Sequence, residues 1–195
     1  MSTGRSGDKQ LMKHGTSISL MLAATAACAP APIRQASSRP QAIAIAAPLL
    51  AAHNRERATF GSPAMVWDPA VAAGATAHAA QLARLGRLQH SSRNARSGQG
   101  ENLWIGTRGA FVLDTMARDW ASERRLFRSG RFPATSRSGN WADTGHYTQM
   151  VWPTTQRLGC GLARSAKWDV LVCRYWPAGN VDGVTIGRNR DWTSR

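Results

Sequence analysis

The chain has 195 residues, of which 43% are hydrophobic and 18% are charged, a composition that suits one packed domain and excludes a disordered chain. No apolar run approaches the roughly 20 residues of a membrane-spanning helix, which argues against a multi-span membrane protein. The formal net charge is +14, and only three of the 25 basic residues are lysines. This arginine bias reflects either a GC-rich genome or a surface that attracts anionic partners such as nucleic acid, acidic lipid or cell-wall polymer.

The N-terminal residues predict an export signal. Lys13 precedes an apolar stretch over residues 18–27, and Ala24-Thr25-Ala26 has the A-x-A form of a cleavage site. Residues 1–27 are therefore predicted to be a signal peptide, with Met12 as an alternative start. The remainder keeps 22 basic and 10 acidic residues, a formal charge of +12. We expect an exported protein, extracellular or periplasmic.

Cys28 follows the predicted signal peptide directly. It is either the lipidated first residue of a bacterial lipoprotein, which would anchor the protein to a membrane, or it is cleaved off or left as an unpaired tail residue. Thr25 argues against lipidation, because such signals usually carry Leu at that place. Residues 28–46 are rich in Ala, Pro, Ser and Arg, and we expect them to form a flexible linker.

The folded domain is expected over residues 47–180, and it begins with helical patterns. Residues 48–58 suit a helix with Pro48 near its first turn. Asp68-Pro69 reads as the N-cap and first residue of a second helix, which should end at Gly86. The apolar face of this second helix consists of Val71, Ala75, Ala79, Leu82 and Leu85.

A third helix is expected over residues 110–125, where Glu123 interrupts an apolar stripe. A carboxylate on a packing face costs desolvation free energy unless it meets a cation, a hydrogen-bond donor or a metal. Glu123 therefore either pairs with an arginine or belongs to a functional site. Residues 128–144 are expected to form a loop, and residues 145–152 one or two helical turns.

Two strands are predicted over residues 157–163 and 168–176, and residues 102–104 are a candidate third strand. Cys160 and Cys173 are equidistant from the centre of the turn between the first two strands. A hairpin would place the two cysteines opposite each other, where a disulfide is possible in an oxidising compartment. The alternative is a pair of packed thiols. The disulfide would contribute about 3 kcal/mol in the chain-entropy model.

The histidines divide into two groups. His53 and His78 lie on predicted helices, where packing is the simpler interpretation, and His14 lies in the predicted signal peptide. His90 and His146 fall outside regular helix faces. No two histidines have a local metal-binding spacing, so spacing alone does not predict a metal site.

Several motifs resemble those of one protein family. Gly145–Trp152 reads GHYTQMVW and Tyr175–Asn180 reads YWPAGN, which closely resemble two signatures of the CAP superfamily, the cysteine-rich secretory, antigen 5 and pathogenesis-related proteins. Further matches follow in the order of the family: His53-Asn54-Arg55, Trp67-Asp68-Pro69, Gly100–Trp104, and Trp120 with Glu123. The resemblance covers residues 47–180, and the chain is identified as a bacterial exported member.

This resemblance implies a fold and a site. The fold would be α+β, an α-β-α sandwich with a small antiparallel sheet between helices. The family's shared cleft carries two histidines and two glutamates, which correspond here to His90, Glu101, Glu123 and His146. The imidazoles of His90 and His146 would bind Zn²⁺ or another divalent cation, weakly because they are only two ligands. Glu101 and Glu123 would orient the imidazoles or accept a proton.

Three functions are compatible with such a site. The leading hypothesis is binding of a lipid, a sterol-like molecule or an anionic envelope component, rather than catalysis. The second is a metal-assisted hydrolase with Glu101 or Glu123 as general base. The third, nucleic-acid binding, has only the charge in its favour. The two pairs could also be a hydrogen-bond network that merely stabilises the cleft. Ser91 lacks the motif of a nucleophilic serine, and residues 181–195 are expected to form a short tail.

Overall fold

The computed structural model describes residues 39–187, which belong to one compact unit. The predicted signal peptide, Cys28 and the first part of the predicted linker lie outside these residues. The helices are α1 (Arg39–Phe60), α2 (Pro69–Leu85), α3 (Arg93–Arg96), α4 (Leu113–Ser122) and α5 (Gly145–Val151), with 3-10 helices η1 (Glu123–Arg125) and η2 (Trp141–Asp143). The strands are β1 (Val66–Trp67), β2 (Gly100–Thr107), β3 (Gly130–Arg131), β4 (Arg157–Arg164), β5 (Trp168–Trp176) and β6 (Thr185–Ile186).

The main sheet has the strand order β1-β4-β5-β2. Its three longer strands are antiparallel, as expected, whereas the two-residue β1 pairs with β4 in parallel and makes the sheet mixed. In the β4–β5 hairpin Cys160 lies opposite Cys173, with their Cα atoms 4.1 Å apart. The predicted disulfide between them is confirmed.

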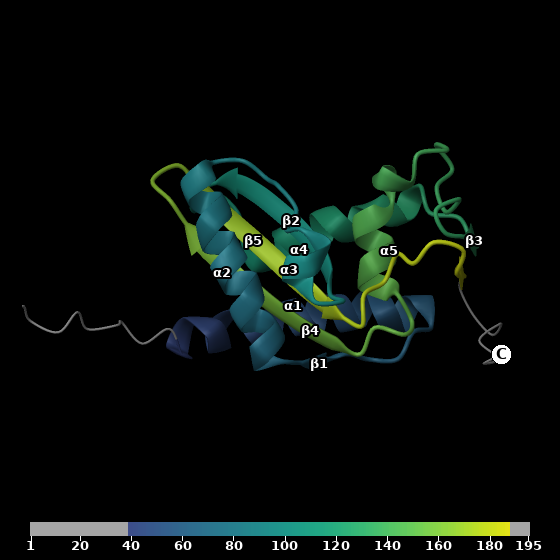
Figure 1. Ribbon diagram of the computed structural model, residues 1–195, viewed down its shortest axis with the longest axis horizontal. Coiled ribbons are helices and arrows are strands. Elements are labelled where there is room, and N and C mark those ends of the chain that lie inside the picture. Colours follow the sequence, from purple (N-terminus) through teal and green to yellow (C-terminus); the bar gives the residue numbers. More distant parts are fainter. Residues whose placement is uncertain (1–38, 188–195) are drawn as a thin grey trace, which may run out of the picture. The chain divides into compact units, whose positions relative to one another are not determined.

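Alternation along β5 separates two apolar cores. Val170 and Val172 pack under α2 with Leu103. Leu171 and Tyr175 face the other way, into the larger core beneath α1, α4 and α5. Figure 1 shows α2 crossing in front of the strands and α1 and α4 behind them. This layering is the expected α-β-α sandwich, because each face of the sheet buries a helical layer.

Helix α2 has the predicted bounds and lies close to the sheet. Asp68 accepts hydrogen bonds from the backbone N–H groups of Ala70 and Val71, and Gly86 ends the helix in the left-handed conformation. A Cβ atom at Gly159 would overlap the backbone of Ala72, so glycine in β4 allows the close approach. No helix within residues 39–187 is long and apolar enough to cross a membrane.

The predicted start of the first helix is wrong. Helix α1 begins at Arg39, so residues 39–46 of the predicted linker are helical, and Pro48 lies inside the helix. An interior proline removes one backbone hydrogen bond, which costs about 3 kcal/mol. Ile45 and Leu49, on either side of Pro48, are both buried in the larger core. Their burial offsets the cost of the proline and extends the helix beyond it.

Two other boundaries differ from the sequence-based expectation. The third helix starts at Leu113 instead of Ala110 and changes to a 3-10 helix at Glu123. The predicted tail 181–195 is part of the domain as far as the structure describes it. In that tail β6 pairs with β3, and Ile186 is fully buried. Short strands of two residues carry no periodic pattern, so the sequence does not reveal them.

Candidate functional site

Glu101, on β2, is the centre of the first polar cluster. His90 donates from Nδ1 to Glu101 Oε1 at 2.9 Å, and the backbone N–H of Ser91 donates to the same oxygen at 3.0 Å. The Ser91 hydroxyl and Arg174 Nε donate to Oε2 at 2.7 and 3.2 Å. Burial raises the pKa of Glu101, but the hydrogen bonds from His90 and Ser91 outweigh it and lower the pKa to about 2. Glu101 is therefore a buried anion at neutral pH.

The same contacts define what Ser91 does. Its hydroxyl donates to Glu101 and accepts from Arg174 Nη2 at 2.8 Å. The Ser91 hydroxyl thus donates its proton in a hydrogen bond to the Glu101 carboxylate, which accepts three other hydrogen bonds as well. This arrangement fixes the position of the loop, and it gives no support to a role of Ser91 as a nucleophile.

A cavity of about 480 Å³ opens beside Glu101, between α2 and the loop that carries His90. Its walls include the apolar side chains of Leu82 and Leu85 and the guanidinium of Arg174. His78, which the sequence suggested to be a packing residue, lies in this wall. Its Nε2 is 2.9 Å from the carbonyl oxygen of Gln89 and 3.9 Å from Glu101 Oε2.

Sequence reasoning did not place Arg174 or His78 at the site. A signal for Arg174 existed, because the alternation of β5 put this arginine on the same face as Val170 and Val172. A guanidinium on a buried strand face needs either an anion or several neutral hydrogen-bond acceptors. Glu101 is that anion.

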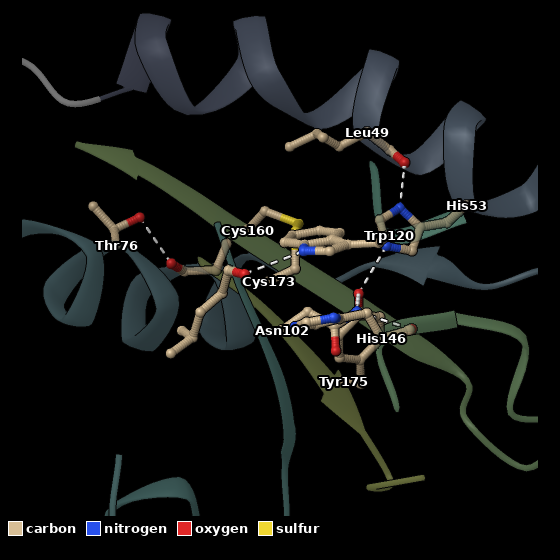
Figure 2. The surroundings of a disulfide bond; sticks show 11 residues. Leu49, His53, Thr76, Asn102, Trp120, His146, Cys160, Cys173 and Tyr175 are labelled. Carbon is tan, nitrogen blue, oxygen red and sulfur yellow. Dashed lines mark hydrogen bonds between the residues drawn. A yellow bond between two sulfur atoms is a disulfide. The ribbon is translucent and has the colours of Figure 1, made fainter. Parts of the chain in front are cut away.

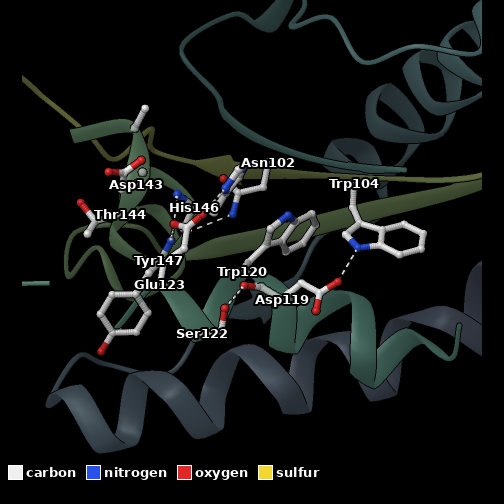
Figure 3. Close-up of polar contacts among 12 residues, drawn as sticks. Asn102, Trp104, Asp119, Trp120, Ser122, Glu123, Asp143, Thr144, His146 and Tyr147 are labelled. Atoms are coloured by element: carbon white, nitrogen blue, oxygen red, sulfur yellow. Dashed lines mark hydrogen bonds and ion pairs between the residues drawn. The ribbon is translucent and has the colours of Figure 1, made fainter. Parts of the chain in front are cut away.

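Glu123 and His146 form the second cluster. His146 Nδ1 donates to Glu123 Oε1 at 2.6 Å. Glu123 Oε2 accepts from the backbone N–H groups of His146 and Tyr147 at 2.9 and 3.0 Å (Figure 3), so the carboxylate also caps the first turn of α5. Trp120 stacks against the His146 ring, with centroids 6.1 Å apart and planes 18° apart. Glu123 therefore pairs with a histidine in the structure, and not with an arginine as the first of the two interpretations had it.

A neutral hydrogen-bond chain connects α1 to this second cluster (Figure 2). His53 Nδ1 donates to the Leu49 carbonyl at 2.7 Å, and its Nε2 lies 2.8 Å from the Tyr175 hydroxyl. Asn102 Nδ2 donates to the same hydroxyl at 3.0 Å and to the His146 carbonyl at 3.1 Å. Burial lowers the pKa of His53 to about 4, so the ring is neutral at pH 7 and its Nε2 accepts from Tyr175. The expected structural role of His53 agrees with these contacts.

Adjacent residues of β2 contact the two His–Glu pairs. Glu101 points to the α2 face with Arg174, whereas the next residue, Asn102, points to the α5 face and contacts His146. The edge strand β2 therefore contacts both pairs. Within residues 39–187 no three His, Cys, Asp or Glu side chains are grouped so as to hold a metal ion. The common cleft and the metal stay predictions.

In each pair the imidazole nevertheless has the hydrogen-bond arrangement of a metal-binding histidine. Both imidazoles use Nδ1 for a carboxylate, which leaves Nε2 for a ligand. The side chains of His90 and His146 are 55% and 35% exposed. Two such nitrogens fit a divalent ion whose remaining positions are filled by water, and they would hold it weakly.

Comparisons with known proteins bear on the same region. The model of the cysteine-rich secretory protein family, CAP, matches residues 50–175. Pathogenesis-related leaf protein 4 of Solanum lycopersicum is 38% identical over 135 residues, which are 69% of this chain and 78% of that protein. Secreted protein RBT4 of Candida albicans is 36% identical over 140 residues, which are 70% of this chain and only 36% of that protein.

The fold has a counterpart among solved structures. The crystal structure of NaASP2 with Zn²⁺ superposes with a TM-score of 0.63 and 25% sequence identity. The superposition covers 75% of this chain and 86% of NaASP2.

Proposed function

Because the chain belongs to the cysteine-rich secretory protein (CAP) family, we propose that it is an exported binding protein that takes a divalent metal ion, such as Zn²⁺, at the edge of β2. His90 and His146 are the ligands, each through Nε2, and Glu101 and Glu123 orient them. The observation that carries this proposal is that a carboxylate holds Nδ1 of each imidazole and leaves Nε2 for a ligand. The crystal structure of NaASP2 with Zn²⁺ adds support by likeness.

The organic ligand is a lipid, a sterol-like molecule or an anionic envelope component. The cavity beside Glu101 supports this choice, because its wall combines Leu82 and Leu85 with the guanidinium of Arg174. A volume of about 480 Å³ is within the range of pockets that bury a small organic molecule. The charge of +12 that remains without residues 1–27 favours an anionic partner.

Export is supported by the relatives, one of which is named a secreted protein. Cleavage of residues 1–27 and the lipid anchor at Cys28 are parts of the proposal, as is the bacterial source. Mass spectrometry of the mature N-terminus distinguishes a diacylglycerol-modified Cys28 from an unmodified or absent one.

Binding is better supported than hydrolysis. Glu101 accepts four hydrogen bonds and Glu123 accepts three. A general base must offer a free lone pair to its substrate. A carboxylate has about four acceptor sites, so Glu101 has none left and Glu123 has one. This near-complete occupancy makes the metal-assisted hydrolase the weaker candidate.

The test is calorimetric titration of the purified protein with ZnCl₂ at pH 7.5. We expect one saturable site, with at least tenfold weaker binding in His90→Ala and in His146→Ala. Asp114→Asn is the matched control, since Asp114 is an exposed carboxylate whose ionic partners are Arg55 and Arg118. Saturable binding that neither histidine variant changes would contradict the proposal.

A separate measurement addresses the organic ligand. Vesicles of phosphatidylglycerol and of phosphatidylcholine are compared at low salt, with and without cholesterol. Preferential binding to the anionic or the sterol-containing vesicles is expected. Equal and negligible binding to all of them would overturn the lipid part and leave the metal part standing.

A further inference from the structure

A second concentration of charge lies away from the cavity and has no role in the proposed function. Residues 124–142 contain five arginines and no acidic residue. Arg131 is engaged, because its Nε donates to the Gly183 carbonyl at 2.6 Å. Three of the others, Arg124, Arg128 and Arg137, line one small cavity of about 260 Å³.

The backbone brings these three arginines together. Phe127 and Ser136 form an antiparallel bridge, flanked by hydrogen bonds from Arg128 N to Thr135 O at 2.9 Å and from Arg137 N to Leu126 O at 2.8 Å. Side chains alternate across such a ladder, so Arg128 and Arg137 lie diagonally on the same side of it. Arg124 joins them because the backbone turns there, with Phe127 N donating to Arg124 O at 3.2 Å.

The segment that carries the arginines is anchored in the larger core. Phe127, between Arg124 and Arg128, is buried and packs edge-on against Phe60 and Tyr147, with ring centroids 5.6 Å apart in both pairs. Because this anchor fixes the backbone, the guanidinium groups need less reorganisation to meet a ligand.

The positive charge of the cavity is largely uncompensated. Arg124 approaches Glu56, but both N–O distances are 3.4 Å and the pair is exposed. Such a contact is worth little in water. Among the residues that the structure describes, no side-chain hydrogen bond or ion pair is made by Arg128 or Arg137. No acidic residue is among those that line the cavity.

We infer that this arginine pocket, formed by Arg124, Arg128 and Arg137 beside Phe127, binds a phosphomonoester group. Guanidinium groups pair with phosphate oxygens through two parallel N–H···O bonds, and their three positive charges exceed the two negative charges of a phosphomonoester dianion. The cavity is smaller than pockets that bury drug-sized molecules, so it suits a phosphorylated head group and excludes an acyl chain. Its polar, cationic lining also separates it from the larger cavity beside Glu101.

The test measures binding of inorganic phosphate and glycerol 3-phosphate by calorimetry in phosphate-free buffer. The triple variant Arg124→Gln, Arg128→Gln, Arg137→Gln removes three charges from the pocket. The matched control Arg84→Gln, Arg87→Gln, Arg93→Gln removes three charges from exposed positions that do not line it. All six side chains are exposed, so both variants should fold, which thermal melting checks.

We expect saturable binding that the pocket variant weakens at least tenfold and the control changes less than twofold. The pair Arg128→Lys, Arg137→Lys, which keeps the charge and loses the forked geometry, should weaken binding about fivefold. Vesicles that contain phosphatidic acid identify the source of the group. Tighter binding to them than to glycerol 3-phosphate indicates a lipid head group, and the reverse indicates a free phosphate ester.

Two results would overturn the inference. One is the absence of saturable binding to every probe. The other is an equal loss in the pocket variant and the control, because the arginines would then act only through net charge. Neither result bears on zinc binding at His90 and His146, so this inference and the proposed function fail independently.

Discussion

The two faces of β2 stabilise buried polar groups in opposite ways. On the α2 face, Glu101 is an anion compensated by Arg174 and by neutral donors. On the α5 face, His53, Tyr175 and Asn102 form a neutral chain, and Arg57 is buried with no carboxylate partner among residues 39–187. The comparison shows two ways to stabilise a buried polar side chain. It is either paired with an opposite charge or hydrogen-bonded to neutral partners.

The largest expected effect comes from Arg57, the cation of the α5 face. Its guanidinium donates to the carbonyl oxygens of Pro63, Met150, Trp152 and Thr155 at 2.6–3.0 Å. Burial lowers its pKa to about 10, so the group stays charged at neutral pH. Arg57→Ala leaves buried carbonyls without donors and should cost about 5 kcal/mol of unfolding free energy.

Urea denaturation of Arg57→Ala measures this effect. Arg55→Ala, two residues earlier, is the control, because Arg55 is exposed and pairs with Asp114 at the surface. A loss below about 1 kcal/mol in Arg57→Ala would mean that water replaces the guanidinium. The hydrogen bonds from Arg57 to the carbonyl oxygens would then not be what stabilises this face.

The two glutamates provide the next test, because they differ in their partners. Glu101 pairs with the buried guanidinium of Arg174, whereas Glu123 pairs with the imidazole of His146. Glu101→Gln leaves Arg174 buried without its anion and should cost about 4 kcal/mol. In Glu123→Gln the amide oxygen still accepts from the first turn of α5, so we expect a loss of only about 1–2 kcal/mol. Urea unfolding at pH 7 compares the two variants. Equal losses would contradict the distinction between the two faces.

The same contrast predicts that the two faces lose stability in two different pH ranges. Unfolded His53 binds a proton near pH 6.5, whereas folded His53 does so only near pH 4, so the unfolded state binds more protons between these values. Stability should therefore fall as the pH drops from 6.5 to 4, by on the order of 3 kcal/mol. Glu101 has a lowered pKa and loses its contribution at lower pH, between about 4.5 and 2.

Unfolding free energies at pH 7.0, 5.5 and 4.0 measure the loss in the first range, and His53→Gln should remove most of the slope. Wild-type stability that is constant from pH 7 to pH 4.5 would show that His53 takes up its proton in the folded state.

The smallest expected effect is at Tyr175, whose hydroxyl connects His53 to Asn102. Tyr175→Phe removes two hydrogen bonds but leaves the ring packed, and should cost about 1–2 kcal/mol. A double-mutant cycle with Asn102→Ala checks the connection, since the two losses should not be additive. Strict additivity would indicate that the chain does not act as a unit.

Local patterns predicted much of this fold. Asp68 and Gly86 define α2 because their capping chemistry depends only on adjacent residues. The positions of Cys160 and Cys173 around the turn predict the hairpin register, and hence the disulfide, for the same reason. By contrast, the start of α1 before Pro48 depends on the burial of Ile45, a tertiary effect that no local pattern contains.

The site was predicted less completely than the fold. Motif resemblance identified His90, Glu101, Glu123 and His146, and the structure joins them in two pairs. It did not identify Arg174 or His78, because their roles depend on which strand face and helix turn come beside Glu101. The contact of β2 with both pairs, through Glu101 and Asn102, likewise depends on tertiary packing, which the sequence does not display.

The most direct test of the account is a zinc-soaked crystal measured at the zinc absorption edge. We predict one anomalous peak at the edge of β2, within coordination distance of Nε2 of both His90 and His146, which is absent after His146→Ala. A peak bound to one of these imidazoles alone, or none near either, would contradict the proposal that the two His–Glu pairs form a single metal site.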